Sequence, residues 1–287
     1  MGTLVTIQVP SANTEAAIER AFGWFHYIED RCTRFNPQSE LMQLTTRIGV
    51  PVEVSAILFE AVQFAVMVAE ESGGAFDPTV GHAMEQRGFD REYSTGEIVH
   101  SGIEPPSDVT YRDVLLAVEH RTITLRRPLL LDLGAVAKGL AVDTAARELQ
   151  PFHDFMIDAG GDLYLGGSNA QGTAWSVGIR HPRQEGLLID RLCASNQAVC
   201  TSGDYERRQH ILDPRTGDPN TRAAAAIAVA SATVVAPSAM LADALATAAF
   251  VLGPTEGITF LERLGVEGLI VTPTLERYET SGLRNAR

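Results

Sequence analysis

One apolar segment of the chain carries two polar side chains whose spacing suits a metal ion. The segment is PSAMLADALATAAFVLG, residues 237–253, and it predicts a helix over 238–252 that is buried on all sides. Its polar exceptions, Asp243 and Thr247, are four residues apart and therefore share one helix face. An ionised carboxylate in apolar surroundings needs a partner, and a carboxylate with a hydroxyl suits a hard cation such as Mg²⁺.

Both residues also have ordinary explanations that the spacing leaves open. Asp243 could cap a helix or pair with a buried arginine, and Thr247 could hydrogen-bond to a carbonyl of its own helix. A metal site and a purely structural role are therefore alternatives for this segment.

A second candidate is His210 in the loop QHILDPRTGDP, residues 209–219, which is rich in turn-forming residues. A histidine beside a carboxylate such as Asp213 can act as a general base near neutral pH. An incidental histidine in a surface turn explains the same pattern. The remaining histidines show no paired spacing that would indicate a site.

The stretch LLLDLGAVAKGLAVD, residues 129–143, has the pattern of a strand that enters a helix through a glycine-marked turn. We expect the strand to meet Asp132, the turn to lie between Gly134 and Gly139, and the helix to begin at about Lys138. N–H groups at such a helix N-terminus can bind a phosphate, although an ordinary strand–helix connection fits equally well. The stretch matches neither the Walker A loop nor the dinucleotide-binding fingerprint.

Two further loops contain paired glycines that would let the backbone approach a ligand closely. GGAFDPTVG, residues 73–81, adds an aromatic ring and an acid, and DAGGD, residues 158–162, adds two acids. A helix C-cap followed by a loop explains the first equally well, and a tight turn between strands explains the second.

The composition is that of a globular protein, with 45% hydrophobic and 21% charged residues in a chain of 287. The net charge of −13 argues against nucleic-acid binding and against docking on an anionic membrane. A phosphate-containing ligand would therefore need local help from N–H groups, a lysine or a cation. No run of about 18 apolar residues exists that would predict a membrane span.

The cysteines and the N-terminal segment indicate which cellular compartment to expect. Cys32, Cys193 and Cys200 predict neither a disulfide framework nor a zinc site. The N-terminal segment has no basic and apolar leader, so we expect a cytoplasmic protein, or a periplasmic lipoprotein if a leader was removed. A homodimer is the default expectation for the oligomeric state.

These candidate residues need a scaffold, and the hydrophobic periodicity predicts helices and strands without a regular β-α-β repeat. That pattern indicates an α+β fold with mixed sheets and packed helices, in one globular unit over residues 1–287. The expected helices lie at 14–31, 40–44, 55–72, from 138 onward, 238–252 and 255–264. The expected strands lie at 3–9, 114–118, 122–125, 155–157, 163–165, 175–179, 187–192, 198–201, 225–231 and 268–272.

Nine motifs, in the order found here, resemble one family, the ApbE family of FAD:protein FMN transferases. They are MGT, RFNPQSEL, GGAFDPTVG, LDLGAVAKGLAVD, IDAGGDLYLGG, WSVGIRHP, CTSGDYER, HILDPRTGDP and PSAMLADALATAAFVLG. Each match alone is weak, but nine matches in register span nearly the whole chain and are highly specific.

The resemblance implies a T-fold-like α+β protein that binds FAD and a divalent cation, normally Mg²⁺. It also implies an enzyme that splits the pyrophosphate of FAD and transfers FMN to a threonine hydroxyl of a target flavoprotein, with release of AMP. Some relatives hydrolyse FAD to FMN and AMP, so an FAD pyrophosphatase is the alternative enzyme. A flavin carrier without turnover is the third possibility.

Position by position, the resemblance implies a catalytic role for His210. It implies metal ligation by Asp243, Thr247 and the backbone carbonyl of Ala135. Some relatives have a second aspartate where this chain has Ala246, so water or phosphate oxygens would complete the coordination here. The positions implied for FAD binding are Met1, Phe35, Ala75, Phe76, Asp77, Asp132, Lys138 and Ile211.

The chain departs from the family pattern just before the implied catalytic histidine. Only Arg208 and Gln209 separate TSGDYER from HILDP, where most relatives carry a longer hairpin. The shorter loop favours the pyrophosphatase modestly, since that loop would help to dock a target protein. The presence of His210, Asp243 and Thr247 argues against a carrier without turnover.

Overall fold

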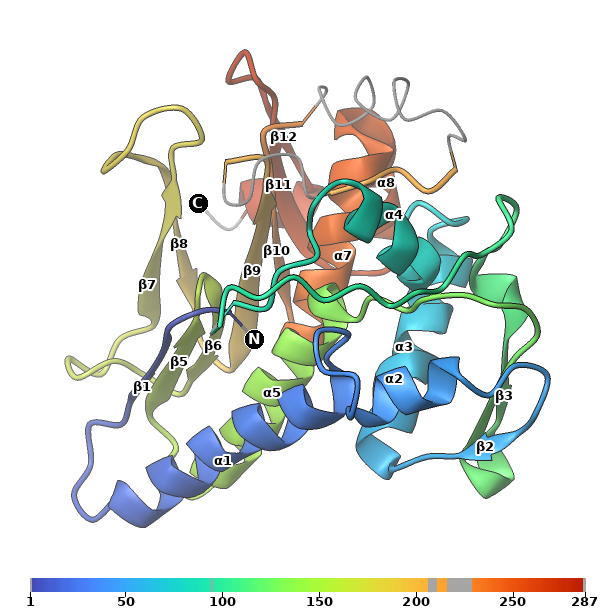
Figure 1. Ribbon diagram of the computed structural model, residues 1–287. Helices are drawn as coiled ribbons and strands as arrows, with labels where there is room; N and C mark the ends of the chain where they lie inside the picture. Colours follow the sequence, from blue (N-terminus) through green and yellow to red (C-terminus); the bar gives the residue numbers. More distant parts are fainter. Residues whose placement is uncertain (1, 94, 206–210, 216–228, 286–287) are drawn as a thin grey trace. The chain divides into compact units, whose positions relative to one another are not determined.

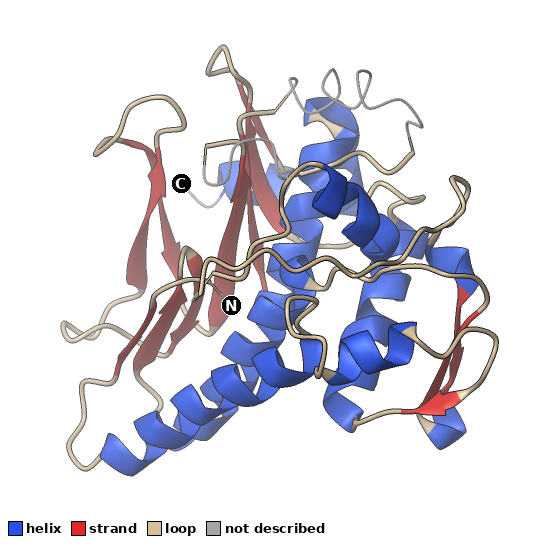
Figure 2. Ribbon diagram, in the orientation of Figure 1, coloured by secondary structure: helices blue, strands red, loops and turns tan. Residues whose placement is uncertain are grey.

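The computed structural model describes residues 2–93, 95–205, 211–215 and 229–285, and it combines helices with antiparallel sheets (Figures 1 and 2). By contacts between Cα atoms, one compact unit comprises Met1–Gly2 and His26–Ala137, and the other comprises Thr3–Phe25 and Lys138–Arg287. The mixture of helices and sheets confirms the expected α+β class. The expectation of one unit over residues 1–287 stays a prediction.

The unit with the C-terminal part of the chain is built on a seven-stranded sheet in which every neighbouring pair of strands is antiparallel. In spatial order its strands are β1 (Val5–Gln8), β5 (Phe155–Ala159), β6 (Asp162–Gly166), β9 (Gln197–Gly203), β10 (Ser231–Ala236), β11 (Glu267–Val271) and β12 (Arg277–Glu279). All six residues of β10 are buried, because its position inside the sheet leaves both of its faces covered.

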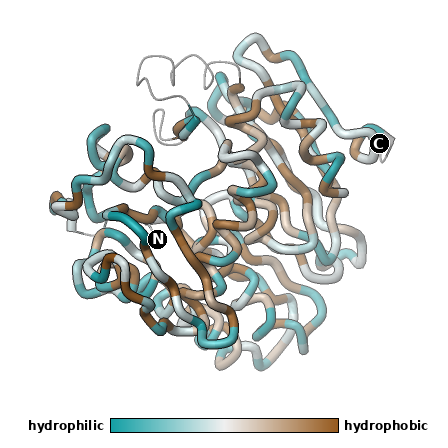
Figure 3. The backbone as a smooth tube through the Cα atoms, turned by 90° about the vertical axis from the view of Figure 1, so that its right-hand side faces the viewer, coloured by the Kyte–Doolittle hydropathy of each residue, from teal (hydrophilic) through white to brown (hydrophobic). Residues whose placement is uncertain are grey.

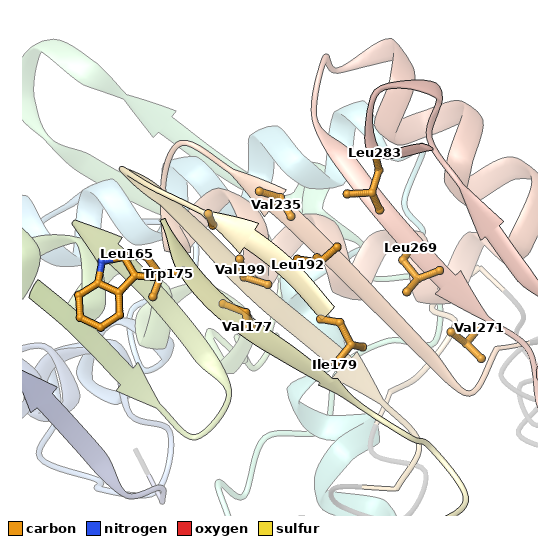
Figure 4. Packing of buried hydrophobic residues seen from close by; sticks show 11 residues of the cluster. Leu165, Trp175, Val177, Ile179, Leu192, Val199, Val235, Leu269, Val271 and Leu283 are labelled. Atoms are coloured by element: carbon orange, nitrogen blue, oxygen red, sulfur yellow. The ribbon is translucent and has the colours of Figure 1, made fainter. Parts of the chain in front are cut away.

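A two-stranded hairpin of β7 (Trp175–Arg180) and β8 (Leu188–Ala194) packs on one face of this sheet. Alternate residues of β7 are buried, which is the period-2 pattern of a strand with one face in the core. Figure 4 shows the resulting cluster, to which Trp175 contributes the largest ring and Val199, Val235 and Leu269 contribute from the sheet. The residues of β7 between the buried ones face away from the core and are exposed.

Helices cover the opposite face of the same sheet (Figure 1). Helix α7 (Ala239–Leu252) packs against β9 and β10, and α8 (Pro254–Arg263) packs against α7 and β11. Helix α5 (Gly134–Leu149) ends in this unit, where Glu148 accepts hydrogen bonds from Arg20 and Trp24 of α1 (Glu15–Cys32). Brown, apolar segments lie on the inner strands and helices in Figure 3, and teal, hydrophilic segments lie mainly on outer loops.

Helix α7 begins at a fixed place because α5 caps it. The buried carboxylate of Asp143 accepts hydrogen bonds from the N–H groups of Ala239 at 2.7 Å and Met240 at 2.9 Å, and Ser238 Oγ accepts from the Leu241 N–H. A Cβ atom on Gly139 would lie 2.5 Å from the Met240 backbone, so only glycine allows the two helices to approach this closely. The start of α7, and hence the height of Asp243 along it, is therefore set by α5.

Replacement of Asp143 by alanine is expected to lower the free energy of unfolding by about 3 kcal/mol, because two buried N–H groups lose their acceptor. Urea unfolding monitored by circular dichroism measures this change, and the exposed Glu119→Ala serves as a control that should shift stability by less than about 0.5 kcal/mol. Equal stabilities of the two variants would show that Asp143 does not anchor α7.

The other unit holds the remaining main elements. A sheet of three strands has the order β2 (Val52–Glu53), β4 (Thr122–Leu125) and β3 (Val114–Ala117). Its helices are α2 (Glu40–Thr45), α3 (Ala56–Glu71) and α4 (Gly81–Gln86), and its short 3-10 helices are η1 (Pro78–Val80), η2 (Tyr111–Asp113) and η3 (Val118–His120).

The unit with the C-terminal part of the chain also contains η4 (Gln150–Phe152) and α9 (Ser281–Asn285). None of the described helices is long and apolar enough to cross a bilayer.

Two sequence-based expectations about elements are wrong. Helix α5 starts at Gly134, not at Lys138, so the expected turn between Gly134 and Gly139 is the first part of the helix. The expected strand before Asp132 does not form, since residues 129–133 belong to no strand and hydrogen-bond to the loop around Pro78 and Gly81. Most of the expected strand at 225–231 lies outside the described residues, and β10 occupies Ser231–Ala236.

Candidate functional site

Three motifs that are far apart in sequence converge in the unit that contains His26–Ala137. Arg34 of RFNPQSEL donates from Nε to Asp132 Oδ2 at 2.7 Å, and its guanidinium carbon lies 4.2 Å from the ring centroid of Phe35. Asp132 also accepts from the Gly134 N–H at 2.8 Å, so it caps the N-terminus of α5. The structure thereby brings together two of the predicted FAD-binding residues, Phe35 and Asp132.

The GGAFDPTVG loop lies alongside the segment that leads to Asp132. The Asp132 N–H donates to the Pro78 carbonyl at 2.7 Å, and the Gly81 N–H donates to the Leu130 carbonyl at 3.1 Å. A Cβ atom on Gly81 would lie 2.6 Å from the Leu130 oxygen, so glycine is required for this approach. The GGAFDPTVG loop is therefore joined by backbone hydrogen bonds to the segment that leads to Asp132.

Within this loop the three predicted residues Ala75, Phe76 and Asp77 are all buried. Asp77 accepts hydrogen bonds from the N–H and hydroxyl of Thr79, at 2.8 and 2.7 Å, and from the Tyr111 N–H at 3.0 Å. Burial raises the pKa of Asp77, and the hydrogen bonds from Thr79 and Tyr111 oppose that shift. The side chain of Asp77 thus fixes the shape of the loop through its own contacts.

A second group of predicted residues lies in the unit with the C-terminal part of the chain. Lys138 of α5 forms an ion pair with Asp162, and its Nζ is also 3.7 Å from Asp243 Oδ2. Asp162 is the last residue of DAGGD and the first of β6, and only 1% of it is exposed. One ammonium group is therefore shared, unequally, between two buried carboxylates.

The predicted pair on α7 is oriented toward polar groups. Asp243 is 5% exposed, and its Oδ2 has no hydrogen-bond partner among the described residues. Burial raises the pKa of Asp243, and the neighbouring Lys138 opposes that shift. Thr247 Oγ1 lies 3.0 Å from Ser202 Oγ of β9, which fixes the hydroxyl on the same face of α7. The ion-pair partner of Asp243 is a lysine, not the arginine considered as its structural alternative.

These donors fit a divalent cation. A buried carboxylate oxygen without a hydrogen bond carries a desolvation penalty that a bound cation would remove, and a hydroxyl one turn along the helix supplies a second oxygen. Among the described residues no three His, Cys, Asp or Glu side chains gather into a metal site. A site here would therefore take one carboxylate together with hydroxyl and backbone oxygens. Ala135, in the first turn of α5, stays a predicted third ligand.

The loop with the predicted catalytic residue is described only in part. His210 and Met1 lie outside the described residues, whereas Ile211 is described and buried. Arg215 holds both oxygens of Asp213 through its Nε and Nη2, each at 2.9 Å. The Asp213 carboxylate also raises the pKa of the Arg215 guanidinium. Asp213 thus pairs with Arg215, and its expected partnership with His210 stays a prediction.

Sequence reasoning missed three residues that the structure adds to these two groups: Arg34, Asp162 and Ser202. Each lies inside a motif that the sequence singled out, but nothing local shows that its side chain would contact Asp132, Lys138 or Thr247. The composition did offer one signal that Lys138 has a specific partner, because it is the only lysine among the 23 basic residues of the chain.

Comparisons with known proteins identify the family. The ApbE family model matches residues 1–270. The chain is 30% identical to the FAD:protein FMN transferase of Treponema pallidum, over 99% of this chain and 85% of the relative. It is also 30% identical to the enzyme of the same name from Vibrio cholerae, over 86% of this chain and 76% of the relative.

Solved structures agree with the sequence relatives. The ApbE protein from Thermotoga maritima superimposes with a TM-score of 0.85 at 29% identity, covering 99% of this chain and 96% of that one. The flavin transferase ApbE from Vibrio cholerae gives a TM-score of 0.84 at 27% identity, covering 100% and 96%. Sequence and fold lead to the same conclusion: this protein belongs to the ApbE family.

Proposed function

We propose that the protein is an FAD:protein FMN transferase. In this reaction the hydroxyl oxygen of a target threonine bonds to the FMN phosphorus, the bond from that phosphorus to the bridging pyrophosphate oxygen breaks, and AMP leaves. The observation that carries the proposal is the Asp243 carboxylate oxygen beside Lys138 that has no hydrogen-bond partner among the described residues, in a chain whose relatives bear this name. Lys138 and a cation bound to Asp243 would supply the local positive charge that pyrophosphate chemistry needs in a protein with a net charge of −13.

Asp243 and Thr247 would hold the divalent cation, with the Ala135 carbonyl as a further proposed ligand. A bound Mg²⁺ would neutralise pyrophosphate oxygens and stabilise the charge that develops on the leaving phosphate. Asp243 contributes an oxygen that accepts no hydrogen bond from any described residue, and Ser202 holds the Thr247 hydroxyl in place at 3.0 Å. Lys138 adds a fixed positive charge next to the carboxylate.

His210 is the proposed general base that accepts the proton of the attacking threonine. An imidazole has an ordinary pKa of about 6.5, which suits proton transfer near neutral pH.

The other positions that the family resemblance implies would hold the two ends of FAD. Phe35 offers a half-buried aromatic face, and Asp132 is kept in place by Arg34 and by the start of α5. The remaining proposed FAD contacts are Met1, Ala75, Phe76, Asp77, Lys138 and Ile211. Arg34 Nη1 is buried and has no hydrogen-bond partner among the described residues, so this guanidinium also has an N–H available.

The experiment that tests the proposal measures AMP and FMN by chromatography after incubation with FAD, in Mg²⁺ or in EDTA. It is run with and without a flavoprotein domain that carries the acceptor threonine. A transferase releases AMP in Mg²⁺ when the acceptor is present and keeps FMN on the acceptor. The second candidate, an FAD pyrophosphatase, is favoured by the short connection of Arg208 and Gln209 and would release free FMN with AMP regardless of acceptor.

A further inference from the structure

Lys138 stands between two carboxylates and lies closer to one of them. Its Nζ forms the close ion pair with Asp162, while Asp243 Oδ2 is 3.7 Å away and makes no hydrogen bond among the described residues. An ammonium group has three donors and rotates freely on its stem, so nothing intrinsic to lysine prevents a direct bond to Asp243. The position of Asp162 must therefore decide which carboxylate the lysine takes.

The hairpin that carries Asp162 has little freedom to move. Asp162 pairs with Ala159 across the turn, and Asp158 Oδ1 accepts from the Gly161 N–H at 2.8 Å. Gly160 has a φ of +67°, and a Cβ atom there would lie 1.9 Å from Thr3 Oγ1. The turn is thus packed against the N-terminal strand segment, and the buried carboxylate after it is held at a fixed point.

Loss of the Asp162 charge would leave Asp243 as the nearest acid for the lysine. A partly buried ammonium group that loses its closest partner favours the remaining carboxylate, so Lys138 would move to Asp243 Oδ2. That new ion pair would occupy the oxygen that is otherwise available to a cation. It would also place a positive charge against the cation itself, an interaction that is strong at close range in a buried site.

We propose that Asp162 is a positioning residue that keeps Lys138 beyond hydrogen-bond distance of Asp243 Oδ2 and thereby leaves that oxygen available to a divalent cation. This inference rests on the cation site of the proposed function. It gives a reason for the acid that ends DAGGD, a motif that sequence reasoning could explain as a turn alone. It also gives the single lysine of the chain a defined partner.

The test is direct binding of Mn²⁺ to the protein without FAD, measured from the electron paramagnetic resonance signal of free Mn²⁺. We expect Asp162→Asn to weaken binding about tenfold or more. The double variant Asp162→Asn with Lys138→Met restores the neutral charge of the pair and removes the competing ammonium, so its affinity should return to within about threefold of the wild type. Asp158→Asn, in the same hairpin, is the matched control and should bind Mn²⁺ like the wild type.

The single lysine provides a second readout that is independent of affinity. Lysine labelled with ¹³C at Cε gives one side-chain signal, which reports the surroundings of Lys138 alone. In the wild type this signal should broaden on addition of Mn²⁺, and in Asp162→Asn it should shift before any metal is added. Asp162→Ser removes the same charge with a smaller side chain and replaces Asp162→Asn if that variant does not fold.

Each outcome has one meaning. Wild-type affinity in Asp162→Asn would overturn the positioning role, and so would a double variant as weak as the single one, because Asp162 would then act on the cation itself. Wild-type protein that binds no Mn²⁺ would instead overturn the cation site of the proposed function. Weak binding in Asp162→Asn with recovery in the double variant supports the inference.

Discussion

Asp243→Ala is expected to reduce Mg²⁺-dependent FMN transfer by about a thousandfold or more, which corresponds to about 4 kcal/mol in the activation free energy. The variant loses the one carboxylate on the apolar helix α7, and with it the oxygen that makes no hydrogen bond in the described structure. Thr247 alone offers a single neutral oxygen, which is a weak ligand for a hard cation. The measurement is the initial rate of AMP release over a range of Mg²⁺ concentrations.

The same variant has a distinctive stability signature. A buried carboxylate with an oxygen that lacks a hydrogen bond raises the free energy of the folded state. Asp243→Ala should therefore melt at or above the wild-type temperature in EDTA. The stabilisation by added Mg²⁺ that we expect for the wild type should be absent from the variant. The exposed Glu119→Ala is the control: its melting temperature in EDTA and its stabilisation by Mg²⁺ should both match those of the wild type. Full activity of Asp243→Ala at limiting Mg²⁺ would contradict the metal assignment.

His210→Ala is expected to lower kcat for transfer by about 10²- to 10⁴-fold, the usual contribution of a general base. The affinity for FAD should stay close to that of the wild type, because the proposed role concerns only the proton of the threonine. Stopped-flow or steady-state rates give kcat, and quenching of flavin fluorescence gives the affinity. The exposed His120→Ala is the control and should behave like the wild type.

A chemical rescue separates a proton-transfer role from a structural one. His210→Gly should regain part of its rate when imidazole is added, with a pH dependence that follows the free imidazole pKa. Loss of FAD binding with unchanged chemistry per bound flavin would show instead that His210 holds the substrate.

Much of the helical scaffold follows from local sequence. The nearly uninterrupted apolar run around Asp243 predicts a helix over 238–252, and α7 spans Ala239–Leu252 with Ser238 as its N-cap. Ser55 likewise caps α3 as its position before an apolar periodic segment predicts. Strong periodicity and a capping residue are local signals, so tertiary contacts do not need to be known.

The start of α5 illustrates what local sequence cannot show. Gly134 and Gly139 look like the two ends of a turn, yet both lie in the helix, and Gly139 is a glycine because the backbone at Met240 passes directly against it. The apolar run before Asp132 looks like a strand, yet its backbone hydrogen-bonds to the loop around Pro78 and Gly81 instead. In both places a contact distant in sequence outweighed a local preference.

The candidate site also contains residues that local sequence predicts and residues that only distant contacts reveal. Residue types and the family resemblance predict Asp243, Thr247 and Lys138, because an acid, a hydroxyl and a lysine are unusual in their apolar surroundings. The residues that orient them, Asp162 and Ser202, could not be predicted, since each acts through one side-chain contact across more than twenty positions of sequence. Positioning residues leave little trace in a single sequence unless they sit in a motif.

The central claim is tested most directly by the mass of an acceptor protein. A flavoprotein domain with the acceptor threonine is incubated with FAD, Mg²⁺ and the protein, beside a Thr→Val version of the same domain. We expect the threonine domain to gain one FMN at that residue, with one AMP released for each FMN attached, and the valine version to remain unchanged. An acceptor of unchanged mass, with FAD intact or converted to free FMN and AMP, would contradict the assignment as a transferase.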